Sequence, residues 1–252
     1  MLFEFYRYLT SPCLPSVKAM GYLREIISME ARYKRCHSDW QPHLDHCQQV
    51  ICHAIQSTPR SGTAIILGSG LLLDVPLKLL AEHFDQVLLV DVVHLRPVRK
   101  AVRRYRNVRL IEADVTGVIE PLHRGSEVPR PSFDPSHHDA VFTVSLNLLS
   151  QLSLLPVEFA KRRGLIPQDD TRFAKTITAH HLDFLRNLTG KVCLITETER
   201  LVNGVFNNDP LYGISLPQPD KTWHWNIAPH PEVDPHDNHS LNMAAFYHFN
   251  QG

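Results

Sequence analysis

Two glycines and a later aspartate have the types and the spacing needed to hold a nucleoside. Gly68-Ser69-Gly70 follows the apolar run Ala64 to Leu67 and precedes an amphipathic stretch, which predicts a buried strand, a tight turn and a helix. Glycine allows a ligand to approach the backbone closely, because it has no Cβ and tolerates positive φ. Asp91 ends the next apolar strand, 21 positions after Gly70, where a carboxylate can accept hydrogen bonds from ribose hydroxyls. The spacing therefore predicts a nucleoside cofactor.

The residues after the turn bear on which cofactor this is. Leu73 stands where a dinucleotide fingerprint has its third glycine, and the carboxylate of Asp74 follows it. An acid at this point disfavours a pyrophosphate and is compatible with a cofactor that carries an ammonium group and no phosphate, of which S-adenosylmethionine is the common example. Asp74 is also explained as the N-cap of the following helix, with Pro76 in the first turn, and the two roles can coexist.

Length and composition limit the class of protein. The 252 residues suffice for one substantial core, and 26 basic residues balance 26 acidic ones, so no global field favours nucleic acid or an acidic membrane. No apolar run approaches the roughly 20 residues that span a bilayer, and the first residues lack the pattern of a secretory signal, so we expect a cytoplasmic protein with no membrane partner. Five cysteines without a CxxC pair predict reduced thiols: Cys13, Cys36, Cys47, Cys52 and Cys193.

The chain before the glycine turn is expected to be helical. Helices over about 16–36 and 42–56 would form an N-terminal helical extension of residues 1–60, followed by a Rossmann-like domain of residues 61–252. The extension is rich in side chains that can contact a ligand, although a helix pair packed on the sheet is the more frequent explanation. These side chains are Arg32, Tyr33, Arg35, Trp40 and His43.

From Thr63 onward strands alternate with helices. This alternation predicts an α/β fold with a doubly wound, mostly parallel seven-stranded sheet, a C-terminal antiparallel hairpin and the helical extension. The expected strands are 64–67, 86–90, 108–112, 139–144 and 191–196, with the hairpin at 222–227 and 242–249. The expected helices reach from the turn to 84 and cover 96–105 and 170–187, and 121–136 is expected to be a loop.

The order of these motifs resembles that of the class I S-adenosylmethionine-dependent methyltransferase superfamily. The resemblance covers Thr63 to Phe249 and places the terminal hairpin where the family has its sixth and seventh strands. The sequence departs from the family pattern at Leu72, where a third glycine is usual, and at Ile66, where an acid is usual. The motifs that carry the resemblance are ILGSG at 66–70, LLVDVVH at 88–94, RLIEADV at 109–115 and DAVFTVSLNLLSQ at 139–151.

The resemblance implies a role for each matched residue. Gly68, Ser69 and Gly70 would face the methionine part of the cofactor S-adenosylmethionine. Asp91 would hold the ribose hydroxyls. The remaining roles implied are contact with adenine for Val92, acceptance from the exocyclic amine for Asp114, and the border of the acceptor's entry for Ser145.

A methyl transfer of this kind needs little from the protein beyond alignment and exclusion of water, so no nucleophilic residue is expected. Asn147, after the fourth strand, is a candidate for orienting the acceptor, and Glu197, at the end of the fifth, is a candidate base. Gln151 and Glu199 lie at the same edge, and capping or surface roles explain all four equally well. We expect a small-molecule acceptor rather than a macromolecule, and no metal.

Four alternatives stay open from the sequence. The basic run Arg96–Arg109 can dock RNA, although such a run is more often a solvated helix face. The histidine-rich loop between 230 and 239 has ligand types for a metal without a fixed spacing. The chain can also be a methyltransferase-like interaction module without catalysis, or a Rossmann-like enzyme that uses another nucleoside such as NAD.

Overall fold

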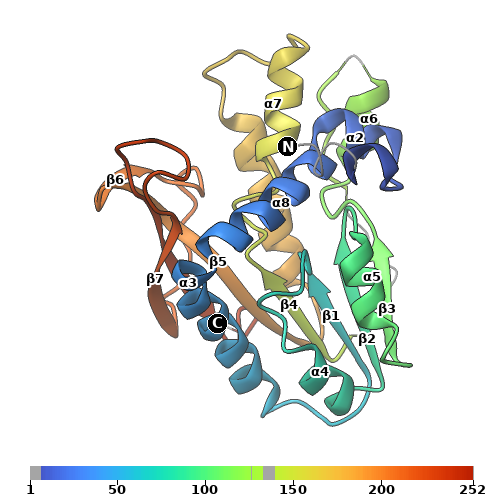
Figure 1. Cartoon of the computed structure of the whole chain (residues 1–252). Coiled ribbons are helices and arrows are strands. Elements are labelled where there is room, and N and C mark those ends of the chain that lie inside the picture. Colours follow the sequence, from blue (N-terminus) through green and yellow to red (C-terminus); the bar gives the residue numbers. More distant parts are fainter. Residues whose placement is uncertain (1–6, 126, 133–139, 252) are drawn as a thin grey trace.

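A single mixed sheet forms the centre of the computed structural model, which describes residues 7–125, 127–132 and 140–251. Its strands lie in the order β3-β2-β1-β4-β5-β8-β7, and β6 pairs with β5 outside this path (Figure 1). The strands are β1 (Thr63–Leu67), β2 (Gln86–Asp91), β3 (Val108–Glu112), β4 (Phe142–Leu146), β5 (Lys191–Val202), β6 (Val205–Asn208), β7 (Lys221–Ala228) and β8 (His239–Phe246).

The first five strands are parallel, and their carboxyl ends meet at one edge. Leu67 lies opposite Val90 of β2 and Ser145 of β4, so β1, β2 and β4 end at almost the same level. β8 is antiparallel to both β5 and β7, which forms the terminal hairpin. The predicted fold class is therefore confirmed: the chain has a doubly wound Rossmann-like α/β fold with a C-terminal antiparallel hairpin.

Helices cover both faces of the sheet and create two hydrophobic cores. Ile65 and Leu67 of β1 belong to the first core, whereas Ala64 and Ile66 belong to the second, because successive side chains of a strand point to opposite faces. The described helices are α2 (Pro15–Met20), α3 (Tyr22–Ile55), α4 (Leu77–His83), α5 (Arg96–Val102), α6 (Ile119–Arg124), α7 (Leu154–Arg162) and α8 (Arg172–Arg186).

Helix α3 contributes to both cores. Its early residues Leu23 and Ile27 pack in the first core, and its later residues Leu44 and Ile51 pack in the second. The 34-residue helix is interrupted at Cys36, where φ is −108° and ψ is 23°, shortly before a proline within the helix. Figure 1 shows α3 running from the region of α2 along the sheet toward its opposite end. The helix thereby passes from one face of the sheet to the other.

The structure corrects several of the predicted boundaries. The N-terminal helices are divided at Gly21, where φ is 100°, and the predicted gap between residues 36 and 42 is only a kink at Cys36, across which α3 continues. Helix α6 occupies the start of the predicted loop 121–136, of which residues 126 and 133–136 lie outside the described residues. β4 begins at Phe142, and position 139 of the predicted strand is also outside the described part.

Four elements were not predicted: α6, α7, β6 and the second half of β5. β6 makes the sheet eight-stranded where seven strands were expected. Its four residues are all exposed, so no alternation of apolar and polar positions marks it in the sequence. The domain boundary after residue 60 stays a prediction, and the helices before it supply residues to both cores.

Two further expectations concern cysteines and membranes. All five cysteines are free thiols. No helix of the described residues combines the length and the apolar character needed to cross a bilayer.

Gly190 provides a test of how the β5 strand meets β4. A Cβ on Gly190 would lie 2.0 Å from the carbonyl oxygen of Ala140, so Gly190→Ala must displace backbone. We expect the free energy of unfolding in urea to fall by at least about 2 kcal/mol. Gly164→Ala is the control, because Gly164 has φ +69° and a Cβ there would have no neighbour within 4 Å. This substitution should lower the free energy of unfolding by only about 1 kcal/mol. Equal losses in the two variants would contradict this packing.

Candidate functional site

The glycine turn joins the carboxyl ends of three strands. Gly68 has φ 79° and donates its N–H to the carbonyl of Val90 over 3.0 Å. A Cβ on Gly68 would lie 2.7 Å from the carbonyl oxygen of Leu146, so only glycine fits between β2 and β4. Gly70 also has positive φ, 46°, but its Cβ would lie 4.0 Å from the nearest carboxylate oxygen of Asp91. A Cβ at this position would therefore make only ordinary van der Waals contacts, so Gly70 is not required by a close approach as Gly68 is.

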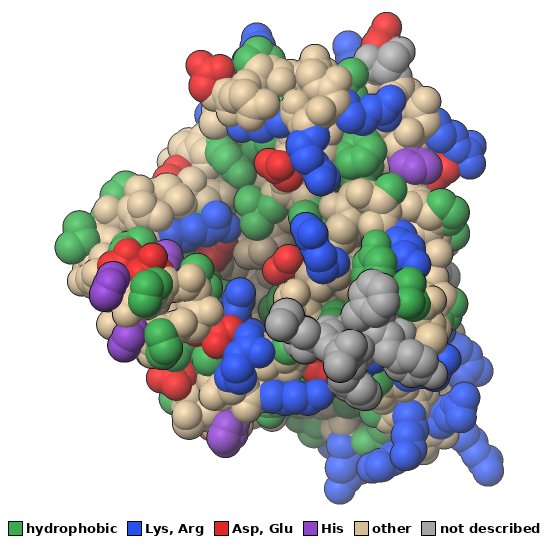
Figure 2. Space-filling view, turned by 45° about the horizontal axis from the view of Figure 1, so that its top comes forward, with side chains coloured by type: hydrophobic (Ala, Val, Ile, Leu, Met, Phe, Trp, Pro, Cys, Tyr) green, Lys and Arg blue, Asp and Glu red, His purple; other side chains and the backbone are tan. Residues whose placement is uncertain are grey.

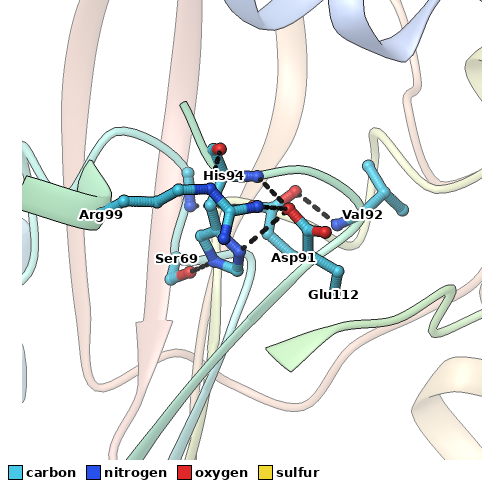
Figure 3. Close-up of polar contacts among 7 residues, drawn as sticks. Ser69, Asp91, Val92, His94, Arg99 and Glu112 are labelled. Carbon is cyan, nitrogen blue, oxygen red and sulfur yellow. Dashed lines mark hydrogen bonds and ion pairs between the residues drawn. The ribbon is translucent and has the colours of Figure 1, made fainter. Parts of the chain in front are cut away.

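Asp91 is held by backbone donors at the end of β2. Its Oδ2 accepts the N–H of Gly70 and its Oδ1 accepts the N–H of Val92, each over 2.8 Å. Burial raises the pKa of Asp91 to about 6, against the lowering effect of these hydrogen bonds. Figure 3 shows Asp91 beside Val92, and Val92 is half-buried. The structure thus brings together the predicted residues of the turn and of β2.

A second set of contacts holds the loop after β2. Buried Ser69 lies with its Oγ 3.1 Å from Nε2 of His94. Glu112 accepts the backbone N–H of His94 over 3.0 Å and is ion-paired with Arg99 (Figure 3). Glu112 lies opposite Asp91 in the register of β2 and β3. Sequence reasoning missed His94 and Glu112, although both belong to the motifs that carried the resemblance.

Asp74 is not the N-cap of α4. That helix begins at Leu77 after Pro76, and no side chain caps it. The Oδ2 atom of Asp74 instead accepts the side-chain N–H of Asn147 over 2.8 Å. Burial raises the pKa of Asp74 to about 6, and the negative charge of Asp91 adds to this rise. The capping interpretation was therefore wrong, and Asp74 lies in the same electrostatic environment as Asp91.

Asn147 lies at the centre of a compact polar cluster. Its φ is 49°, and its backbone N–H donates to the carbonyl of Ile195 over 2.9 Å. Its side-chain nitrogen lies 3.2 Å from Nε2 of His43 and 3.5 Å from Sγ of Cys47. Its Oδ1 is buried and has no hydrogen-bond partner among the described residues. This oxygen is available to accept a hydrogen bond from a ligand.

His43, Cys47 and Asp74 are the one group of described residues whose ligand atoms lie close enough for a metal, within 4.8 Å of one another. The indole N–H of Trp223 donates to Nδ1 of His43 over 3.1 Å. Burial lowers the pKa of His43 to about 3, so the ring is neutral. A histidine that binds a metal through one ring nitrogen usually donates a proton from the other, but Nδ1 of His43 faces the indole donor of Trp223, so this arrangement does not suit a metal.

Asp114 and Ser145, two other residues predicted to contact the ligands, already have polar partners within the protein. Asp114 accepts from the backbone and hydroxyl of Thr116 through one oxygen and from the N–H of Ile119 through the other. Ser145 is buried, with its Oγ 3.0 Å from Nε2 of His181. Their contacts with adenine and with the acceptor stay predictions.

Glu197 is buried at the end of the parallel part of β5. Its Oε1 accepts from Arg200 and from Gln151, and its Oε2 has no partner among the described residues. Among the hydrogen bonds of the described residues, none joins Glu197 directly to Asn147. Glu199 is bonded to Asn242 on the neighbouring strand. The two catalytic candidates therefore belong to separate clusters.

Tyr22, the first residue of α3, is a site residue that sequence reasoning missed. Burial, followed by the charges of Asp114 and Asp91, raises the pKa of its hydroxyl well above the usual value. The phenol thus lies in the field of both carboxylates. No local sequence pattern indicates this position, because it depends on the path of α3 above the sheet.

The other ligand-type side chains of α3 have mainly structural contacts. Arg35 binds Glu232 of the histidine-rich loop, and Arg32 lies 3.4 Å from the same carboxylate. Buried Trp40 donates its indole N–H to the carbonyl of Ile227 over 2.9 Å. Tyr33 packs at 6.0 Å from Trp40. Of this group, only His43 reaches the polar cluster.

The histidine-rich loop does not gather its polar residues around one point. Glu232 is bound to the arginines of α3, as described above. Asp234 accepts the N–H of His236, and Asp237 accepts from Asn203. The loop therefore ties the terminal hairpin to α3 and to the end of β5.

No family model and no curated protein matches this chain. Among solved structures, a 1,6-didemethyltoxoflavin-N1-methyltransferase from Burkholderia thailandensis matches 93% of this chain and 92% of its own, with 12% identity and a TM-score of 0.42. The N-methyltransferase NodS from Bradyrhizobium japonicum, in complex with S-adenosyl-L-homocysteine, matches 79% and 85%, with 11% identity and a TM-score of 0.40. The 23S rRNA methyltransferase ErmE matches 82% and 70%, with 10% identity and a TM-score of 0.36. The fold assignment rests on the strand order and register of this chain.

The raised pKa of Asp74 generates a prediction about stability. In the folded chain this group keeps its proton up to about pH 6, against a usual value of 3.8, so the stability that it contributes below pH 4 is lost as the pH rises through 6. We expect Asp74→Asn to be about 1 kcal/mol more stable than wild type at pH 7.5 and equal to it at pH 4, measured by urea unfolding. Comparison with wild type at each pH removes the contribution of the buried histidines.

The matched control is Asp169→Asn, because Asp169 is exposed. This control should follow the wild-type curve at both pH values. An Asp74→Asn variant that is less stable than wild type at pH 7.5 would contradict the uncompensated burial of this carboxylate.

Proposed function

We propose that the chain is an S-adenosylmethionine-dependent methyltransferase that transfers the methyl group in line to an unidentified acceptor. The observation that carries the proposal is the pair of carboxylates, Asp74 and Asp91, beside the glycine turn. Both have a pKa raised to about 6, and among the described residues no lysine or arginine forms an ion pair with either. Two desolvated carboxylates without a cation favour a ligand that brings positive charge and hydroxyl donors.

The residues present fit this cofactor. Asp91 would accept the ribose hydroxyls, and Asp74 would face the ammonium group of the methionine part. The absence of a side chain at Gly70 would let the ligand approach the backbone next to the Asp91 carboxylate. Tyr22 would cover the adenosine side from α3. When bound, the cofactor supplies a methyl group already activated by a sulfonium.

The start of α4 separates this proposal from a dinucleotide cofactor. A pyrophosphate is stabilised by the N-terminus of a helix that begins directly after the glycine turn. Here the helix begins at Leu77, seven positions after Gly70, and Asp74 lies between them. The carboxylate would repel a phosphate at this point, so NAD is the less suitable ligand.

In this proposal Asn147 would act on the acceptor. Its unpartnered Oδ1 would accept a hydrogen bond from an N–H or O–H group, while its amide N–H stays bonded to Asp74. This arrangement would orient the acceptor and exclude water from the reacting groups. The unpartnered Oε2 of Glu197 would take the proton where the acceptor is protonated. A small-molecule acceptor remains part of the proposal.

The first test compares two cofactors. We expect S-adenosylhomocysteine to raise the melting temperature of the full chain, because a ligand that binds only the folded state stabilises it. NAD at the same concentration should leave the melting temperature unchanged. A shift with NAD and none with S-adenosylhomocysteine would overturn the proposal in favour of another nucleoside enzyme, and no shift with either would favour the non-catalytic alternative.

The second test concerns the ribose contact. Asp91→Ala removes a carboxylate whose charge-assisted hydrogen bonds contribute about 1.5–3 kcal/mol each, so calorimetry should show S-adenosylhomocysteine binding weakened at least about tenfold. Asp91→Asn keeps the shape and loses the charge, so its affinity should lie between those of wild type and Asp91→Ala. Equal affinities for all three proteins would show that Asp91 holds no ribose.

The third test uses the pH dependence of binding. Both carboxylates have a pKa of about 6, so they lose their charge as the pH falls through this value. We expect the affinity for S-adenosylhomocysteine to fall at least about tenfold between pH 7.5 and pH 5, since one group with this pKa is only about one-tenth ionised at pH 5. In Asp74→Asn the decline should be shallower. A pH-independent affinity in wild type would contradict recognition of a cation by these carboxylates.

A further inference from the structure

Six basic side chains form an exposed surface on α5, on the strand β3 and on the turn that joins them. We call this set the α5–β3 basic surface, and every member is exposed: Arg96, Lys100, Arg103, Arg104, Arg106 and Arg109. The stretch from residue 96 to 111 contains no acidic residue, although the whole chain has as many acidic as basic residues. Positive charge is therefore concentrated here and balanced elsewhere.

Within the described part of the chain, no acidic side chain neutralises the charge of this surface. Other surface helices pair their basic residues with acids one turn away, as in Lys78–Glu82 of α4, Arg124–Glu120 of α6 and Arg162–Glu158 of α7. For the six residues of the α5–β3 basic surface, no carboxylate of the described chain lies within ion-pair distance. The solvated face of an ordinary helix is interleaved with acids, and α5 differs from that pattern.

Arg99 is the one arginine of this stretch that forms an ion pair among the described residues, so it is not counted in the α5–β3 basic surface. Arg99 is half-buried and binds Glu112 beside the loop after β2. It therefore fixes α5 against the end of β3 and leaves the other basic residues free of that contact. Figure 2 shows a group of Lys and Arg side chains at the lower right, on the side where α5 and β3 lie in Figure 1. β3 is an edge strand, so this side of the sheet is not covered by a further strand.

We propose that the α5–β3 basic surface docks a nucleic-acid duplex through its phosphate backbone. Five of the six residues are arginines, whose planar guanidinium groups bind phosphate through two parallel hydrogen bonds. Exposed positive charge on adjoining elements is the electrostatic footprint of phosphate binding. The inference needs no bound cofactor and stands apart from the proposed methyl transfer.

The apolar residues of the same stretch argue against two other polyanions. Val98, Val102 and Val108 are buried, so the surface has no apolar side chain of this set to insert into a membrane interface. Single-stranded nucleic acid is bound largely by stacking its bases on aromatic rings. The one aromatic residue of the stretch, Tyr105, is half-buried. Phosphates presented by a duplex fit the surface best.

The test measures binding of the full chain to a fluorescently labelled duplex of 20 base pairs by polarisation. We expect DNA and RNA duplexes of the same sequence both to bind, because the contacts are to phosphates, and the affinity to fall steeply between 50 and 200 mM salt. Arg103→Ala with Arg104→Ala should reduce the slope of log affinity against log salt by about 1.8 on DNA, if each arginine contacts one phosphate. Arg103→Glu with Arg104→Glu should weaken binding at least about tenfold.

The control variant changes the charge equally at another exposed place, Arg24→Glu with Lys175→Glu. It should bind as the wild type does, and melting temperatures verify that each variant is folded. Equal weakening by the two double Glu variants, absence of duplex binding at 50 mM salt, or binding to phosphatidylglycerol vesicles without duplex binding would each overturn the proposal. If the glutamate variant does not fold, the wild type and the alanine variant are compared instead. Equal slopes of log affinity against log salt for these two proteins would then overturn the proposal.

Discussion

The approach of Gly68 to the carbonyl of Leu146 is the constraint on which the candidate site depends. A Cβ there would lie 2.7 Å from that oxygen, so the turn can bridge β2 and β4 only with glycine at this position. Once the turn is seated, the N–H of Gly70 reaches the carboxylate of Asp91, and the loop that follows brings Asp74 to Asn147. Backbone packing at one residue therefore positions the polar groups of three separate segments.

The carboxylates at the carboxyl ends of the parallel strands differ in whether a cation is paired with them. Glu112 has Arg99 as a partner, whereas Asp74 and Asp91 have only N–H donors among the described residues. Backbone and amide donors stabilise a carboxylate less than a full cation does, and burial therefore dominates the pKa of both groups. Leu72, at φ 63°, lies in the same loop in a conformation that is costly for a side chain of its size. Desolvated charge and backbone strain are thus concentrated in the loop between β1 and α4 and at the adjoining end of β2.

Strong local patterns predicted the fold well, and long-range contacts set the limits of the prediction. Each parallel strand is a short apolar run followed by a turn, and β1, β2 and β3 were located to within one residue of their structural bounds. Gly68, Gly70 and Asp91 were found because their spacing reflects local geometry. Tyr22 and His94 were not assigned to the site, and His43 was only one of five ligand-type side chains named, since their positions depend on the packing of α3 and of the loop after β2. Asp74 was assigned to a helix cap because its partner, Asn147, is 73 positions away.

The connection between α3 and the terminal hairpin has a consequence for the order in which the chain folds. Trp40 donates to the carbonyl of Ile227, and His43 accepts from Trp223, so the helix is joined to a strand about 180 residues later in the chain. During synthesis the part of α3 around Trp40 and His43 therefore cannot complete its packing until β7 has emerged from the ribosome. Contacts of such sequence separation slow folding, because the long intervening loop must close before they form. One of the first elements to be synthesised is thus among the last to reach its final packing.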